Sequence, residues 1–255
     1  MTIPPPESRT AARPGAGGPA AFSNTRWSIV LRAGQGGDSA DKTRALESLG
    51  RTYWPPLYAW LRSSGHTSED AEDLVQSLFH DLLTKDSLAT LSEGGGRFRS
   101  VLMTSLKNIA VDEYRKRGAA KRGGGSVFVS LDIEQGELLV KAADQKQSPD
   151  TAFDRNWAHT VLGAATADLR DSYIAAGREA LFTALRPSLF GSGEVRSYDQ
   201  LAEELGMSRG AVAMSVKRMR ERFGELITQR VAETVADASE VREEMRYLLS
   251  LFACT

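Results

Sequence analysis

The 255-residue chain has one cysteine, three histidines and no hydrophobic run that approaches the roughly 18 residues of a membrane helix. The single cysteine, Cys254, cannot form an internal disulfide, which agrees with a reducing compartment. Residues 1–22 have Pro, Gly and Ala where a signal peptide needs a continuous apolar segment, and so predict a disordered leader that stays attached. We therefore expect a cytoplasmic protein that makes no membrane contact.

Residues suited to catalysis or metal binding are few and scattered. His66, His80 and His159 lack metal-ligand spacing, and Cys254 has no companion. The glycine runs at 94–96 and 123–125 lack the Lys-Ser/Thr ending of a phosphate-binding loop. The sequence thus predicts no catalytic site, no metal, no cofactor and no small-molecule substrate, and the protein is not expected to be an enzyme.

Charge is distributed in blocks that the net value of −1 conceals. The segment 97–122 has eight basic and two acidic side chains, a net charge of +6, whereas 69–81 has five acids and no Lys or Arg. Adjacent blocks of opposite sign suggest two different partners. Hydrophobic residues make up 41% of the chain, enough for a globular core.

Helical periodicity dominates the chain and predicts an all-α fold of two helical domains joined by a flexible linker. In the first domain, 23–122, a short apolar turn at 57–61 follows Trp-Pro-Pro, a capped helix begins near Ser68, and a further helix runs over 98–117. The linker, 123–147, is polar and mildly acidic, with short strands expected at "VFVSLDI" and "ELLVKA". Ser148 and Pro149 then open a helix with spacing that continues toward Ala184.

A helix-turn-helix pattern closes the second domain, 148–228. Ser197 and Gln200 form a capping box, residues 206–208 make a turn, and Ser208 caps the next helix. That helix has an apolar stripe, with basic side chains away from it, as in a recognition helix that enters a DNA groove. A packed helical hairpin with a solvated basic face is the alternative.

The C-terminal extension, 229–255, keeps helical spacing, and "DASE" at 237–240 offers a fresh cap, so that one long helix or two are possible. Its apolar stripe is expected to pack on the second domain. The alternative is that it docks on the first domain and hides a DNA-binding surface.

Three motifs in this order, "DAEDLVQ" (70–76), "RFRSVLMTSLKNIAVDEYRKR" (97–117) and "SYDQLAEELGMSRGAVAMSVKRMRERF" (197–223), resemble those of bacterial RNA polymerase sigma factors of the extracytoplasmic-function (ECF) type. The resemblance implies that the first domain binds core polymerase and the −10 promoter element, and that the second binds the −35 element. The implied polymerase-binding residues are Asp70, Glu72, Asp73 and Gln76. The implied −10 residues are Arg97, Arg99, Lys107, Asn108, Arg115, Lys116 and Arg117, and the implied −35 residues are Ser208, Arg209, Lys217, Arg218 and Arg220.

The sequence departs from the family pattern at several positions. Val101 stands where Trp is frequent, Ser77 replaces an acid, and Ala213 and Ser215 replace basic residues, which predicts fewer phosphate contacts at the −35 element. The resemblance implies core RNA polymerase, promoter DNA and an anti-sigma protein as partners. A free-standing helix-turn-helix regulator that binds its operator as a dimer, and an adaptor that contacts only proteins, are the alternatives.

Overall fold

The computed structural model describes residues 39–84, 97–117, 133–142, 148–190 and 196–253. Within these ranges the chain is helical and has no strand, so the predicted all-α class is confirmed. The leader 1–22 lies outside the described residues. The elements are α2 (Ser39–Ser63), α3 (Ser68–Thr84), α5 (Phe98–Arg117), α6 (Ile133–Ala142), α7 (Pro149–Ala175), α8 (Glu179–Leu185), η2 (Arg186–Leu189), α9 (Tyr198–Leu205), α10 (Arg209–Ala232), η3 (Ala238–Glu240) and α11 (Val241–Ala253).

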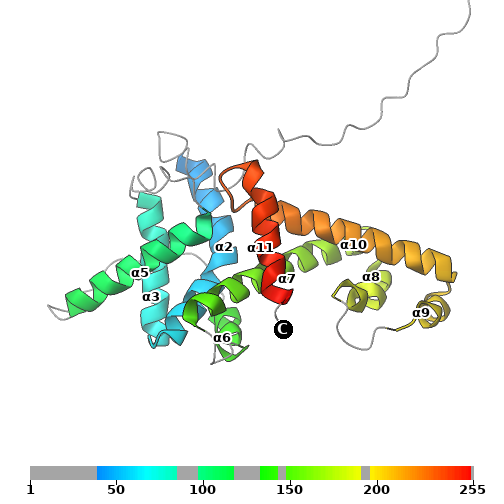
Figure 1. Cartoon of the computed structure of the whole chain (residues 1–255), viewed down its shortest axis with the longest axis horizontal. Coiled ribbons are helices and arrows are strands. Elements are labelled where there is room, and N and C mark those ends of the chain that lie inside the picture. Colours follow the sequence, from blue (N-terminus) through cyan, green and yellow to red (C-terminus); the bar gives the residue numbers. More distant parts are fainter. Residues whose placement is uncertain (1–38, 85–96, 118–132, 143–147, 191–195, 254–255) are drawn as a thin grey trace, which may run out of the picture.

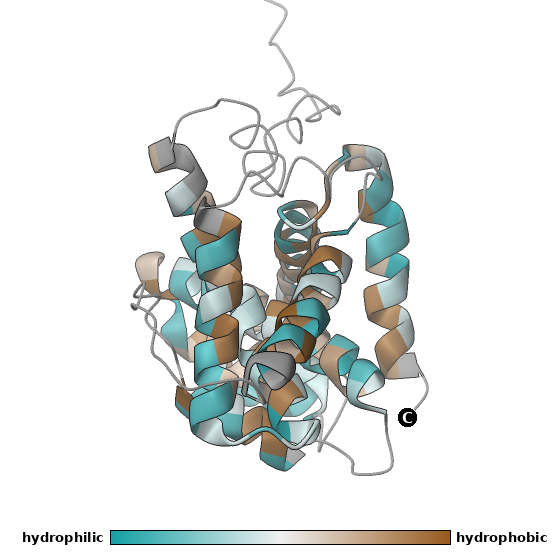
Figure 2. Cartoon of the chain, turned by 90° about the vertical axis from the view of Figure 1, so that its left-hand side faces the viewer, coloured by the Kyte–Doolittle hydropathy of each residue, from teal (hydrophilic) through white to brown (hydrophobic). Residues whose placement is uncertain are grey.

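The long helix α7 connects the two ends of the molecule (Figure 1). It packs against α2 at one end and runs beside α10 toward the other, where α8 and α9 lie. Trp157 and Phe153 of α7 are buried in one continuous hydrophobic core with Trp54 of α2 and Phe223 of α10. Seen from the end that carries α5, the helices show hydrophobic and hydrophilic bands along their length, as expected for helices buried on one side (Figure 2). The two predicted domains therefore share a core.

Helix α2 corrects the expected apolar turn at 57–61. Pro55 and Pro56 lie inside this 25-residue helix instead of preceding a short turn. A proline inside a helix removes a backbone hydrogen bond. Here both prolines and the residues from Tyr53 to Ala59 are buried, so packing on all sides of the helix compensates for the two lost bonds.

The predicted helix starts are confirmed in detail. Thr67 accepts from the Asp70 amide at the start of α3, Ser148 caps α7, and Ser197 with Gln200 forms the capping box of α9. The expected helix toward Ala184 is interrupted, because Gly177 adopts a φ of 68° after Ala175 and its amide donates back to Ile174. A left-handed glycine ends a helix at low conformational cost. The extension likewise contains two helices rather than one, since α10 ends at Ala232 and α11 begins at Val241.

The strand expected at "ELLVKA" is wrong. This segment belongs to α6, which packs on α2. Gly136 lies against the Tyr58 ring, and the Tyr58 hydroxyl donates to Glu137 at 2.6 Å. This hydrogen bond and the Arg62 charge lower the pKa of the Glu137 carboxylate. Local alternation suggested a strand, but the close approach to two aromatic rings selects a helix. The other expected strand, "VFVSLDI", is residues 127–133, and all of it except residue 133 lies outside the described residues.

Replacing Gly136 with alanine should destabilise this contact. The added Cβ would lie 2.6 Å from Cδ1 of Tyr58 and 3.0 Å from Cζ3 of Trp54. We expect a loss of about 1–3 kcal/mol in the free energy of unfolding, measured by urea denaturation, because buried rings must shift. Gly163→Ala on α7 is the matched control, since nothing lies within 4 Å of its added Cβ, and it should stabilise the helix. Equal changes in the free energy of unfolding for the two substitutions would contradict a close contact between residue 136 and the two rings.

None of the described helices combines the length and the apolar character that a membrane crossing requires. The predicted domain boundaries, 23–122, 123–147, 148–228 and 229–255, stay a prediction.

Candidate functional site

Helix α3 has one buried face and one acidic face. Leu74, Val75 and Leu78 are buried in the core, which turns the opposite side of the helix outward. Asp73 is exposed, and Gln76, one turn further on, is half-buried beside it on this outer side. The predicted polymerase-binding residues Asp73 and Gln76 thus occupy the centre of a common face.

The other two predicted residues of this set flank that face and make local contacts. Glu72 is half-buried and accepts a hydrogen bond from the Ser68 hydroxyl at 3.2 Å. Asp70 is half-buried, and its amide donates to Thr67. Acids in the first turn of a helix also stabilise it through the helix dipole. Asp73 is therefore the member of the set that is most available to a partner.

The arginines at the start of α5 are engaged by acids from α7 and α11. Arg99 is only 7% exposed. Its guanidinium donates to Glu244 at 2.7 Å and to Asp154 at 2.7 Å, and it stacks over the Tyr247 ring at 4.2 Å. Burial alone would lower the pKa of Arg99, but the hydrogen bond and charge of Glu244 outweigh burial and raise it. Arg97 contacts Glu244 at 2.7 Å and Glu243 at 2.6 Å.

Further along α5, Lys107 and Asn108 are exposed. Lys107 donates to Asp150 at 2.8 Å, and this bond lowers the pKa of the Asp150 carboxylate. The Trp60 indole also donates to Asp150, at 2.9 Å. The remaining predicted −10 residues, Arg115, Lys116 and Arg117, form the last turn of α5. The seven predicted residues thus follow α5 and the residue before it; Arg97 and Arg99 at its start are engaged by acids, and Asn108 is exposed.

Helices α9 and α10 are joined by the expected tight turn. Gly206 adopts a φ of 61°, and Ser208 caps α10 by accepting from the Ala211 amide. A left-handed conformation suits glycine because it has no Cβ. The buried stripe of Val212, Val216 and Met219 orients the helix.

The exposed side of α10 has an apolar centre with basic neighbours. Met214 lies opposite the buried stripe and is 47% exposed. Lys217 and Arg218 flank it and are exposed, although Lys217 lies 3.8 Å from Glu221. Because residues three and four apart share a helix face, these three side chains form one surface.

Two other predicted −35 residues lie at the edge of that surface. Arg209 is 3.6 Å from Asp199 of α9. Arg220 donates to the Ser188 carbonyl at 2.7 and 3.0 Å, which ties α10 to η2. A guanidinium that satisfies a buried carbonyl is fixed in place, so Arg220 has a structural contact in addition to its predicted role.

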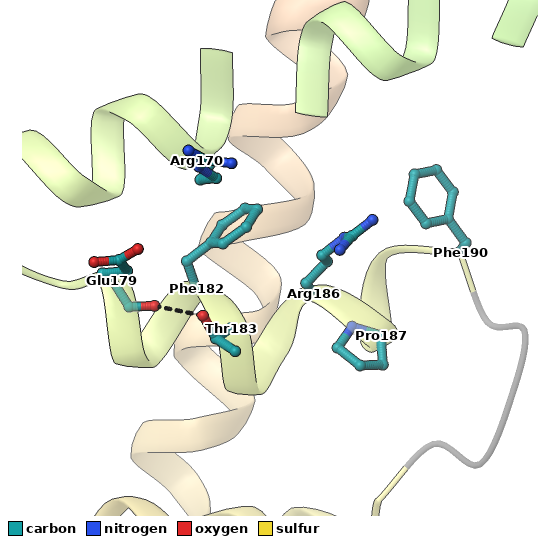
Figure 3. A pocket seen from close by; sticks show the side chains of 7 residues that line it. All are labelled: Arg170, Glu179, Phe182, Thr183, Arg186, Pro187 and Phe190. Atoms are coloured by element: carbon teal, nitrogen blue, oxygen red, sulfur yellow. Dashed lines mark hydrogen bonds between the residues drawn. The ribbon is translucent and has the colours of Figure 1, made fainter. Parts of the chain in front are cut away.

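A surface hollow lies between α7, α8 and η2 (Figure 3). Thr183 inside it donates to the Glu179 carbonyl of its own helix at 3.0 Å, so its hydroxyl is engaged locally. Among the described residues, no cluster of His, Cys, Asp or Glu could hold a metal ion. The hollow is lined by Arg170, Glu179, Phe182, Thr183, Arg186, Pro187 and Phe190.

Sequence reasoning missed the acids that engage the basic residues of α5. Glu243 and Glu244 lie 146 and 145 positions along the chain from their partners Arg97 and Arg99. Asp150 and Asp154 were not among the predicted site residues. The only available signal was the acidic first turn of α11, which is also what the helix dipole favours.

The described part of the chain is helical and has one acidic helix face, on α3, and basic residues on two separate helices, α5 and α10. Residues 51–162, somewhat less than half of the chain, match the ECF sigma factor family, and this match supports an ECF-type sigma factor with a role in transcription initiation. The match covers α2 from Arg51 through α6 and about half of α7, whereas α8 to α11 lie outside it. No curated protein and no solved structure matches the chain.

Proposed function

We propose that this protein binds core RNA polymerase through the exposed face of α3 and directs it to promoters. The observation that carries the proposal is the position of Asp73 and Gln76 at the centre of that face, inside the segment that matches the family. An acidic face with a hydrogen-bonding amide complements a basic helical partner, and it increases both the association rate and the specificity of docking.

The −10 element is proposed to bind along α5. Asn108 is exposed and can donate to and accept from a base or the backbone. Lys107 and the three basic residues of the last turn, Arg115 to Arg117, supply positive charge for phosphates. Phosphate contacts hold the helix on the strand, and Asn108 is the candidate for sequence readout.

The −35 element is proposed to bind the exposed face of α10. The first half of a recognition helix contacts base edges, and Met214 lies there with Lys217 and Arg218 beside it. An apolar side chain in the major groove contacts the methyl group of thymine, so Met214 favours a thymine-containing site. Fewer basic groups near the groove imply a smaller phosphate contribution to affinity.

Arg218→Ala should weaken promoter binding by about three- to tenfold. The salt slope, the fall of log affinity with log salt concentration, should become smaller by about 0.9, as loss of one phosphate contact requires. The measurement is the affinity of the polymerase-bound protein for a promoter fragment selected from a randomised library, at several salt concentrations. Arg222→Ala is the control, because Arg222 is exposed on the same helix but pairs with Glu225 at 2.8 Å. Loss of affinity with an unchanged salt slope would contradict a phosphate contact by Arg218.

Complex formation with core RNA polymerase tests the proposed function. The chain and the core enzyme should elute together in size-exclusion chromatography, at a mass that corresponds to one copy of each. A chain that ignores core polymerase and binds a palindromic site as a dimer would instead be a free-standing regulator. An anti-sigma protein is a further proposed partner, expected to cover the same surfaces.

A further inference from the structure

Acidic side chains of α11 cover the two arginines at the start of α5. Two consecutive glutamates of α11, Glu243 and Glu244, contact Arg97 and Arg99 at 2.6–2.7 Å. Glu244 is 1% exposed and binds both arginines. Four carboxylates engage the predicted −10 residues: Asp150 and Asp154 come from α7, and Glu243 and Glu244 come from α11.

Contacts beyond the ion pairs fix α11 on the junction between α5 and α7. The Tyr247 hydroxyl donates to Asp154 at 2.6 Å, and the Phe252 ring meets His159 edge-on with centroids 5.1 Å apart. The connection that precedes α11 also contacts α5, since the Phe98 amide donates to the Thr234 carbonyl at 3.2 Å. The expectation that the extension packs on the second domain is thus incomplete, because it also contacts the first.

A carboxylate and a phosphate compete for the same arginine. Both are anions that accept paired hydrogen bonds from a guanidinium. With Arg99 buried under Glu244 and Tyr247, its guanidinium cannot neutralise a phosphate while α11 stays in place. Docking of α11 and contact between DNA and the Arg99 guanidinium are therefore mutually exclusive.

We propose that α11 is an intramolecular competitor of promoter DNA for Arg97 and Arg99, and that it leaves α5 when the promoter complex forms. This inference rests on the proposed function, because it assigns a regulator to the −10 surface. DNA phosphates replace the two glutamates, so the ionic part of the docking is exchanged rather than lost. The exchange makes the isolated protein a weak DNA binder and confines strong binding to the complex with polymerase.

Hydrogen–deuterium exchange of the full chain tests the inference without a substitution. The amides of α11 should be protected in the free chain and should exchange at least about tenfold faster in the complex with core polymerase and promoter DNA, because local opening removes their protection. The amides of α7 provide the internal reference. Absence of any complex would overturn the proposed function. A complex in which the amides of α11 keep their protection would overturn only the proposal that α11 competes with DNA.

Glu243→Gln provides a second test. The Glu243 side chain is 63% exposed, so the variant should fold normally, and it removes one charge that competes at Arg97. The free chain should bind a fluorescent duplex of mixed sequence about two- to fivefold more tightly at low salt, the range expected for one exposed ion pair. Glu225→Gln on α10 is the control, because it removes the same charge from a side chain that is 65% exposed. Equal effects of the two substitutions would show a general charge effect and overturn competition at Arg97.

Discussion

Asp73→Lys should reduce the affinity for core RNA polymerase by about thirtyfold, which corresponds to about 2 kcal/mol, because it places a positive charge against the proposed basic partner surface. Asp73 is exposed on α3, opposite the buried residues of that helix. The substitution should therefore leave the free energy of unfolding within about 0.5 kcal/mol of the native value. The dissociation constant is measured by fluorescence anisotropy with labelled protein and core enzyme.

Glu47→Lys is the matched control for this prediction. Glu47 is exposed on α2, outside the proposed polymerase surface, and its replacement changes the net charge by the same amount. Affinity should then fall for Asp73→Lys alone. If both variants lose affinity equally, the interaction depends on overall charge and not on the face of α3. If neither does, the proposed surface is wrong.

Trp157→Ala should destabilise the whole described fold by about 3–5 kcal/mol, the range observed when large buried aromatic side chains are truncated. Trp157 is fully buried on α7 in the core that also contains residues of α2 and α10, and the Arg99 guanidinium lies 5.2 Å from the ring centroid. Truncation would leave a cavity at the place where the two predicted domains meet. The measurement is urea denaturation followed by residue-resolved hydrogen exchange.

A shared core predicts that α3 and α10 lose protection together in this variant. Trp157→Phe is the control, since it keeps an aromatic ring in the same space and should cost less than half as much. If α10 unfolds at a lower urea concentration while α3 stays protected, the two domains are independent and the shared core does not couple them.

Local signals predicted the helices whose ends are encoded by neighbouring residues. The capping residues Ser148, Ser197 and Ser208 each predicted a helix start that the structure contains. The same rules failed for α2, because two prolines look like a helix end unless the burial of the surrounding side chains is known. They failed again for α6, where contact with Tyr58 and Trp54 decides the conformation of an ambiguous apolar segment.

The candidate site was predictable in its residue types but not in its pairing. Acidic and basic blocks identified α3 and α5, and helical spacing identified the outward face of α10. Ion pairs between Arg99, Glu244 and Asp154 join residues that are 145 and 55 positions apart, and no periodic pattern in the sequence encodes them. Only the packing of α7 and α11 against α5 shows that Arg97, Arg99 and Lys107 are already engaged.

Run-off transcription with purified core polymerase, this protein and a library of promoter fragments tests the central claim most directly. We predict transcripts of defined length that appear only when the protein is added, from templates that share two sequence elements at a fixed separation. Core enzyme that starts at the same positions with and without the protein, or at none, would contradict the claim that this chain directs promoter recognition.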